Sequence, residues 1–177
     1  MCLAKPILII RKMSHVACST REEPLLKKAA SAAYQSMNNG FKTEEARPEE
    51  LIALLFEKAC SSLRAVTLIP INDLDELDVQ TRVDYIASYH QNSGKVLQIL
   101  TSLKEVVDIE RGGEVALQLR ETYDVLAKVL WKSVKDKNIA DMKVVLSALQ
   151  DLREGWSSVV QFGASSQKTN QSSLALN

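Results

Sequence analysis

The sequence predicts an all-α protein, an antiparallel four-helix bundle with an extra short N-terminal helix and flexible tails. Apolar residues recur at intervals of three and four over several long stretches, and no stretch alternates as a strand would. Only six glycines and four prolines interrupt the 177 residues. Apolar residues at this spacing line one face of an α-helix. Helices with one apolar face and short connections pack side by side in opposite directions.

The first two bundle helices are predicted from Pro48 to about Val66 and over about residues 78–107. Pro48 suits a helix start because the first helical residue needs no N–H donor. Arg47 before it lacks the hydroxyl of a preferred N-cap, whose loss costs about 1 kcal/mol. The stripe of the first helix comprises Leu51, Leu54, Leu55, Ala59, Leu63 and Val66. The seam of the second helix is interpreted as Val83, Ile86, His90, Ser93, Leu97, Leu100 and Val107, widened by Val96 and Leu103.

The pair Gly112–Gly113 is interpreted as the turn between the second and third helices. Two glycines reverse a backbone without steric cost, and Glu114 after them favours the positive end of the next helix. The third helix is predicted from Glu114 to about Lys135. Asn138 is expected to cap the fourth helix, which continues to about Val159.

The two ends of the chain differ in composition from the middle. The first 33 residues carry a net charge of +4 in an otherwise acidic chain, and a weak apolar stripe from Pro24 predicts the extra helix. From Gly163 the sequence is polar and low in complexity, which is typical of a disordered tail. The predicted parts are a flexible arm over residues 1–23, a helical-bundle domain over 24–162 and a disordered tail over 163–177.

The cysteines and the apolar stretches indicate a cytoplasmic protein. Cys2, Cys18 and Cys60 are odd in number and have no C-x-x-C spacing, which favours free thiols in a reducing compartment. Residues 3–10 are apolar but short and interrupted, with no cleavage site after them, so no signal peptide is expected. No stretch approaches the roughly 20 apolar residues of a membrane span. The zero net charge argues against nucleic acid as the main partner.

Side chains that could carry catalysis or hold a metal are scarce. His15 and His90 are the two histidines, and neither belongs to a Glu-x-x-His, Cys/His or His/His ligand pattern. A nucleophilic cysteine needs a general base nearby, and His90 is the one candidate base for Cys60. Cys60 is therefore interpreted as a small core residue. Gly112–Gly113 follows no strand and precedes no Lys-Ser or Lys-Thr, so it is not a phosphate loop. We expect no enzyme, no cofactor and no metal site.

Five motifs lie in order over about residues 33–157. They are Ala33-Tyr34-Gln35, Ala46 to Glu57 with its Pro-Glu-Glu-Leu, Leu103 to Ala116 with the glycine pair, Leu119 with Tyr123-Asp124 and Leu130, and Leu149 with Leu152 and Trp156. Together they resemble the bacterial flagellin-export chaperone family, FliS. Two departures are Arg47, where the family usually has Ser or Thr, and Phe56, where it usually has Tyr. The 33 residues ahead of Tyr34 also exceed the usual few, which indicates a divergent member.

The resemblance implies a cytosolic chaperone that binds the disordered C-terminal segment of flagellin. Such a protein prevents premature polymerisation and aids export, and its further partners are the flagellar export gate and a co-chaperone. In this family the N-terminal stretch can cover the apolar groove that the client occupies. Two alternatives stay open: a helical adaptor or chaperone for another secreted protein, and a structural homo-oligomeric bundle.

The second helix carries apolar side chains outside its interpreted seam, and helix-in-groove recognition uses such a second face. The alternative is that this face packs against the N-terminal helix. A further predicted contact is Tyr123 on the third helix, for which the alternative is core packing. Two more are Tyr34 and Gln35, for which the alternative is an unconstrained surface tyrosine. Trp156 is expected to cover an end of the bundle, with its N–H bound to an acceptor. The predicted contacts on the second helix are Tyr85, Tyr89, Val96, Ile99 and Leu103.

Overall fold

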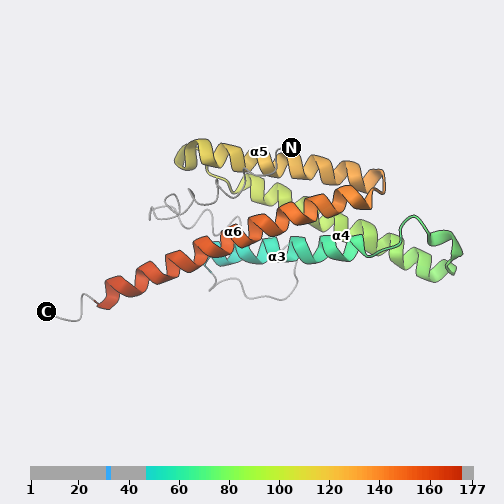
Figure 1. Ribbon diagram of the computed structural model, residues 1–177, viewed down its shortest axis with the longest axis horizontal. Helices are drawn as coiled ribbons and strands as arrows, with labels where there is room; N and C mark the ends of the chain where they lie inside the picture. The colour runs from blue at the N-terminus through green and yellow to red at the C-terminus, as the bar shows by residue number, and fades with distance from the viewer. Residues whose placement is uncertain (1–30, 33–46, 173–177) are drawn as a thin grey trace.

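The computed structural model describes residues 31–32 and 47–172, and the side chains of the last helix as far as Ser158. Four long helices follow one another, each antiparallel to the one before it (Figure 1). The described residues contain no strand, so the all-α prediction is confirmed. Apart from the helical Ser31 and Ala32, the predicted N-terminal helix and arm lie outside the described residues. The elements are α3 (Pro48–Thr67), a 3-10 turn η1 (Leu74–Glu76), α4 (Val79–Glu105), α5 (Ile109–Lys135) and α6 (Ile139–Ser172).

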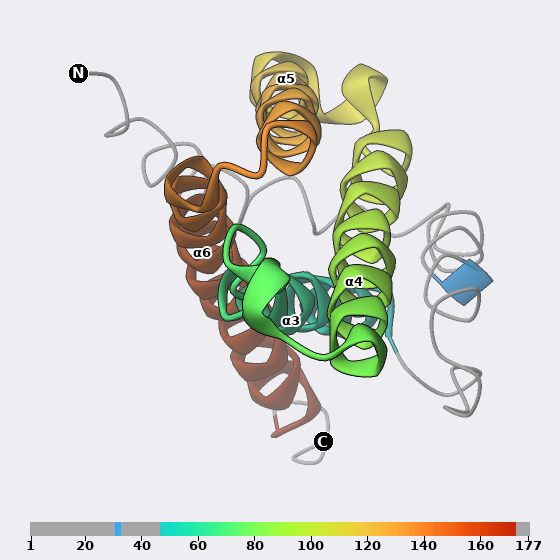
Figure 2. The same ribbon diagram turned by 90° about the vertical axis from the view of Figure 1, so that its right-hand side faces the viewer.

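The helices form a ring around one core, seen end-on in Figure 2. Helix α3 packs against α4 and α6, and α5 packs against the same two from the opposite side. Each helix therefore lies beside its neighbours in sequence, which short connections allow. The core is mostly aliphatic, as the low aromatic content predicts. Its largest fully buried side chains are Tyr89, Phe56, Leu51, Leu55, Leu63, Ile99, Leu100, Leu103, Leu130, Met142, Leu149 and Val66.

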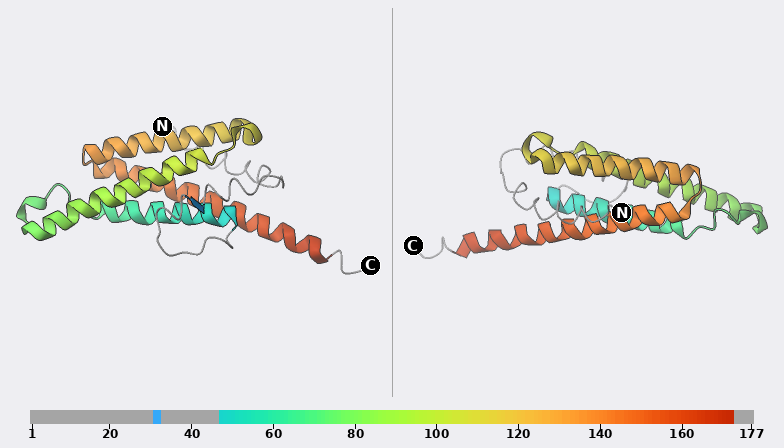
Figure 3. Two further views of the ribbon diagram at one scale, coloured as in Figure 1. Left: turned by 180° about the vertical axis from the view of Figure 1, so that it is seen from behind. Right: turned by 45° about the horizontal axis from the view of Figure 1, so that its top comes forward.

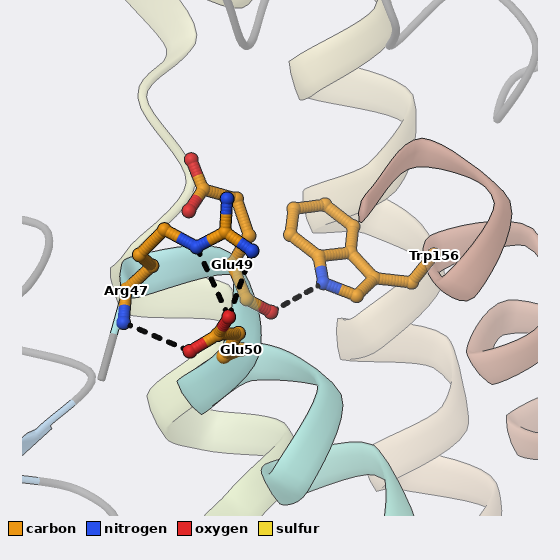
Figure 4. Close-up of polar contacts among 4 residues, drawn as sticks. All are labelled: Arg47, Glu49, Glu50 and Trp156. Atoms are coloured by element: carbon orange, nitrogen blue, oxygen red, sulfur yellow. Dashed lines mark hydrogen bonds and ion pairs between the residues drawn. The ribbon is translucent and has the colours of Figure 1, made fainter. Parts of the chain in front are cut away.

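Helix α3 begins at Pro48, as predicted. Arg47 has no hydroxyl to cap the helix, and an ion pair between Arg47 and Glu50 stabilises this end instead. The Arg47 N–H donates to Glu50 Oε2 (3.2 Å), and its Nη2 and Nε donate to Glu50 Oε1 (2.8 and 3.0 Å). These bonds from Arg47 hold the pKa of Glu50 below its ordinary value. Next to them, Trp156 Nε1 from α6 donates to the Glu49 carbonyl oxygen at 2.9 Å (Figure 4). The expected acceptor for the Trp156 N–H is thus confirmed.

The reversal between α4 and α5 lies a few residues before the glycine pair. Helix α4 ends at Glu105, and Asp108 Oδ1 caps α5 by accepting from the Arg111 N–H at 3.1 Å. One turn later the helix breaks at Gly113, where φ is 53° and ψ is −137°. The predicted reversal at the glycines is therefore wrong in position. Residues 106–108 turn the chain, and Gly113 then redirects it into the long part of α5.

A Schellman motif ends α5 and leads directly into α6. The Asn138 N–H donates to the Ser133 carbonyl at 2.8 Å and the Lys137 N–H to the Val134 carbonyl at 3.3 Å, with Lys137 at a φ of 53°. Asn138 Oδ1 then accepts from the Asp141 N–H at 3.2 Å. The prediction that Asn138 caps the fourth helix is confirmed.

The buried stripe of α4 matches the predicted seam in part, because Ser93, Val96, Leu100 and Leu103 are buried as predicted. Val83, Ile86 and His90 are exposed, because the segment Val79–Ser88 extends past the end of the bundle and meets no other helix there (Figures 1 and 3). Beyond this segment α4 lies between α3 and α5, so it buries a broad stripe. Periodicity alone could not tell which of two adjacent stripes faces the core. The buried residues of α4 are Tyr89, Ser93, Val96, Ile99, Leu100 and Leu103.

Helix α6 is longer than predicted and runs past the bundle at its C-terminal end (Figure 1). Residues 163–172, which composition predicts to be part of a disordered tail, are helical in the structure. No proline follows Ile139 to stop the helix. Extending an existing helix fixes one residue per added hydrogen bond. The packed first part of α6 can therefore support a longer helix.

Alanine at Gly94 and at Gly113 should change stability in opposite directions. At both positions an added Cβ meets no atom within 4 Å, so the backbone alone decides. Gly94 is helical, and alanine there should raise the free energy of unfolding by about 0.5–1 kcal/mol. At Gly113 the positive φ makes alanine strained, which should lower that free energy by about 1–3 kcal/mol. Urea unfolding of the two variants measures this, and shifts of the same sign would contradict it.

Candidate partner-binding surface

The structure places most of the predicted partner contacts inside the bundle. Tyr89, Val96, Ile99 and Leu103 are each at most 1% exposed, and Tyr123 is 3% exposed. All five belong to one core cluster with residues of α3 and α6. These five side chains are therefore turned toward the core in the free protein, and their contact with a partner stays a prediction.

The remaining predicted contacts fall elsewhere. Tyr85 lies on the projecting part of α4 and is partly exposed, so it is available to a partner. Tyr34 and Gln35 lie outside the described residues, and their role stays a prediction.

The two buried tyrosines have structural contacts that join helices. Tyr89 Oη donates to the Val134 carbonyl at 3.0 Å and so ties α4 to the last turn of α5. The Tyr123 ring packs against Phe56 of α3, with centroids 6.3 Å apart. Burial raises the pKa of both tyrosines, so both keep their hydroxyl protons. The ring of Phe56 is 1% exposed and fills this part of the core.

Large exposed apolar side chains gather on two surfaces instead. The first, the α5 face, is the outer side of α5 and includes Trp131 at 60% and Val125 at 57% exposure. The second, the α4 tip, is the projecting segment Val79–Ser88. The signal for the α5 face was present in the sequence, because a tryptophan and several valines lie off the core stripe of the third helix. The apolar residues of the α5 face are Leu117, Val125, Val129 and Trp131; those of the α4 tip are Val79, Val83, Tyr85 and Ile86.

Charged side chains border the apolar part of the α5 face. Asp124 accepts from Lys104 Nζ of α4 at 2.8 Å and from Lys128 Nζ one turn along α5 at 2.6 Å. Hydrogen bonds from these two lysines lower the pKa of Asp124 to about 2. Lys135 Nζ lies 5.7 Å from the Trp131 ring centroid, within the range of a cation–π contact. An open depression adjoins, lined by Lys104, Leu117, Arg120, Glu121, Asp124 and Val125.

The described residues offer no site for metal chemistry. Within residues 31–32 and 47–172, no three His, Cys, Asp or Glu side chains come together as a metal site would require. The Cys60 thiol is buried, and burial raises its pKa away from the reactive thiolate form. His90 is exposed and meets the Tyr89 ring edge-on at 5.4 Å. In the same part of the chain, no helix combines the length and apolar character that crossing a membrane requires.

Comparison with known proteins identifies the family. The chain matches the family described as FliS, flagellar protein FliS, over residues 30–162. It belongs to the FliS family of flagellar export chaperones. A relative, the flagellar secretion chaperone FliS of Salmonella typhimurium, is 27% identical over 128 residues, which cover 72% of this chain and 87% of that protein. The resemblance drawn from the five motifs is thus confirmed. The match ends before residues 163–172, the part of α6 that extends past the bundle.

Ile99→Asp is expected to abolish cooperative folding, because it buries an unpaired charge at a position with no exposure. Val125→Asp, on the exposed α5 face, is the matched control and should melt within a few degrees of the unchanged protein. Thermal unfolding followed by circular dichroism compares them. An Ile99→Asp protein that melts like the control would show that α4 does not pack as described.

The Asp124 carboxylate should make stability depend on pH in the acid range. Its folded pKa of about 2 lies below the ordinary 3.8. Such a group stabilises the fold above its unfolded pKa and loses this contribution as the pH falls through the folded pKa. The free energy of unfolding should therefore fall between about pH 4 and pH 2, and less steeply in Asp124→Asn. Urea unfolding across this range tests it, with Asp151→Asn on the exposed side of α6 as control; equal acid dependence in both variants would refute the assignment.

Proposed function

We propose that this FliS-family protein binds the C-terminal segment of flagellin in the cytoplasm, keeps it from polymerising early and aids its delivery to the flagellar export gate. The observation that carries the proposal is the family match over residues 30–162. The relative from Salmonella typhimurium, a flagellar secretion chaperone by name, supports it. A co-chaperone is a further proposed partner of this complex.

The physical demand on such a chaperone is to cover an apolar surface reversibly. An amphipathic segment that polymerises must have its apolar side covered to remain single. A segment that folds as it binds gives up about 2–5 kcal/mol of interaction free energy in ordering. The affinity that remains permits release at the export gate without a nucleotide-driven step.

We propose that the client binds the α5 face, because large apolar side chains are exposed along the outer side of this helix. Leu117, Val125 and Trp131 extend over 15 residues of α5, so that the first and the last lie about 21 Å apart along the helix. This is enough for several turns of an amphipathic helix, which binds through apolar anchors along one side. An exposed tryptophan is the residue type that most often dominates such binding energy.

The charges around this row favour a client with acidic side chains beside its apolar stripe. Arg120, Lys128, Lys132 and Lys135 outnumber Glu121 and Asp124 on this part of α5. Asp124 is already held between Lys104 and Lys128. The border of the α5 face is therefore basic. The predicted contacts Tyr34 and Gln35 belong to the same proposal, as residues that precede α3 and contact or cover the client.

The proposal predicts that a flagellin C-terminal peptide binds one to one and that the α5 face governs its affinity. Trp131→Ala and Val125→Ser should each weaken binding at least about tenfold, since truncating an interface anchor typically removes more than 1.4 kcal/mol. Calorimetric titration gives the affinity, and size-exclusion chromatography gives the stoichiometry. Val144→Ser, at an exposed valine of α6, is the control and should change the affinity less than about twofold.

Three other outcomes of these binding experiments would each point to a different conclusion. Unchanged affinity in both α5 variants would remove the client from this face. A protein that binds no flagellin peptide but binds another secreted protein would be an adaptor or a chaperone for that protein. A homodimer that ignores the peptide would be a structural bundle.

A further inference from the structure

The α4 tip is a helical surface that the bundle leaves without a neighbour. Val79, Val83 and Ile86 are 75%, 53% and 39% exposed, and His90 after them is exposed as well. From Val79 to His90 these four residues are spaced by four, three and four positions. The alternating d and a positions of a coiled coil have the same spacing. Figure 3 shows this end of α4 reaching past the other three long helices. The tip therefore presents the seam of a coiled coil with no partner helix in the described part of the chain.

The root of the tip is held in place by the fold. Asp78 Oδ1 caps α4 by accepting from the Thr81 N–H at 3.0 Å. Arg82 Nη2 donates to the Leu77 carbonyl at 3.2 Å, and Leu77 packs against the core beside the buried Leu74. The helix is therefore formed and oriented before any partner arrives. Such preorganisation reduces the entropy that binding costs.

The charge around the seam is strongly acidic. Five exposed carboxylates lie between residues 73 and 86 against one basic residue, so the local net charge is −4. That one basic residue, Arg82, already donates to the Leu77 carbonyl. No ion pair within the described residues neutralises the five carboxylates. They are Asp73, Asp75, Glu76, Asp78 and Asp84.

We infer that the α4 tip binds a basic amphipathic helix of a second protein. The partner's apolar seam packs on Val79, Val83 and Ile86, and its flanking lysines or arginines face the carboxylates. Charge complementarity selects this partner and steers its approach. Over the 12 residues from Val79 to His90 the seam is about 16 Å long. Its area falls well below the roughly 800 Å² per partner of a stable interface, so the complex is transient.

A second copy of this chain fits the tip poorly. In a homodimer through the tip, two regions of residues 73–86, each with a net charge of −4, would lie close together and repel each other. The flagellar client proposed above fits poorly as well, because the border of the α5 face is basic, whereas the residues before and beside the tip are acidic. One ligand does not complement both surfaces. The tip is thus a separate contact, for a protein other than the client.

The test uses a fluorescein-labelled peptide of three heptads with Ile at a, Leu at d and Lys at e and g, titrated with the full chain and followed by fluorescence anisotropy. The control peptide has Glu at e and g; like charges keep both peptides monomeric. The lysine peptide should bind at least about tenfold more tightly than the glutamate peptide. Its affinity should fall at least about tenfold in Val83→Ser/Ile86→Ser, whose replaced side chains are exposed, so that the fold is retained.

Two further variants separate the tip from the client surface. Asp75→Asn/Asp84→Asn should weaken the lysine peptide and flatten the dependence of its affinity on salt. Trp131→Ala/Val125→Ser should leave the lysine peptide unaffected, and Val83→Ser/Ile86→Ser should leave the flagellin peptide unaffected.

Three results would overturn the inference. They are equal affinity for the two peptides, equal affinity in the unchanged protein and in Val83→Ser/Ile86→Ser, and a concentration-dependent homodimer that those serines abolish. None of these bears on whether flagellin binds the α5 face.

Discussion

The position of α4 between α3 and α5 constrains the rest of the structure. To fill both contacts, α4 turns a broad stripe inward, and this stripe includes Tyr89, Val96 and Leu103. Tyr89 also donates to the Val134 carbonyl and so fixes α4 against the end of α5. With that stripe buried, the surface available to partners must come from other parts of the helices. It comes from the outer side of α5 and from the segment of α4 that extends past the ring.

These two surfaces differ in a way that bears on function. The α5 face lies on a helix packed along its whole length, and a basic border surrounds its exposed Trp131. The α4 tip projects from the bundle (Figure 1), and the region of residues 73–86 that includes most of it is acidic. An export chaperone has to bind its client and also contact a second protein. Two surfaces of opposite charge allow these two contacts to exist at the same time. A single apolar groove would force the two partners to compete.

Much of the fold followed from local rules. Pro48 starts α3, Asn138 caps α6 and the Trp156 N–H has an acceptor, because each depends on chemistry within a few residues or on one buried polar group. The five motifs also led to the correct family. The exposed side of α4 did not follow from its sequence, because choosing between two adjacent apolar stripes requires knowing where the neighbouring helices end. Val83 and Ile86 have the spacing of core residues in the sequence. They are exposed because the start of α4 extends beyond the ends of α3, α5 and α6.

The account depends on a closed α4 core and an open α5 face, and methyl NMR tests both in one titration. With valine, leucine and isoleucine methyls labelled, a flagellin C-terminal peptide should shift the signals of Val125 and Val129 and leave those of Val96 and Ile99 in place. If the Val96 and Ile99 signals shift while Val125 and Val129 stay fixed, the bundle opens to admit its client along α4. The surface assigned to α5 would then be contradicted.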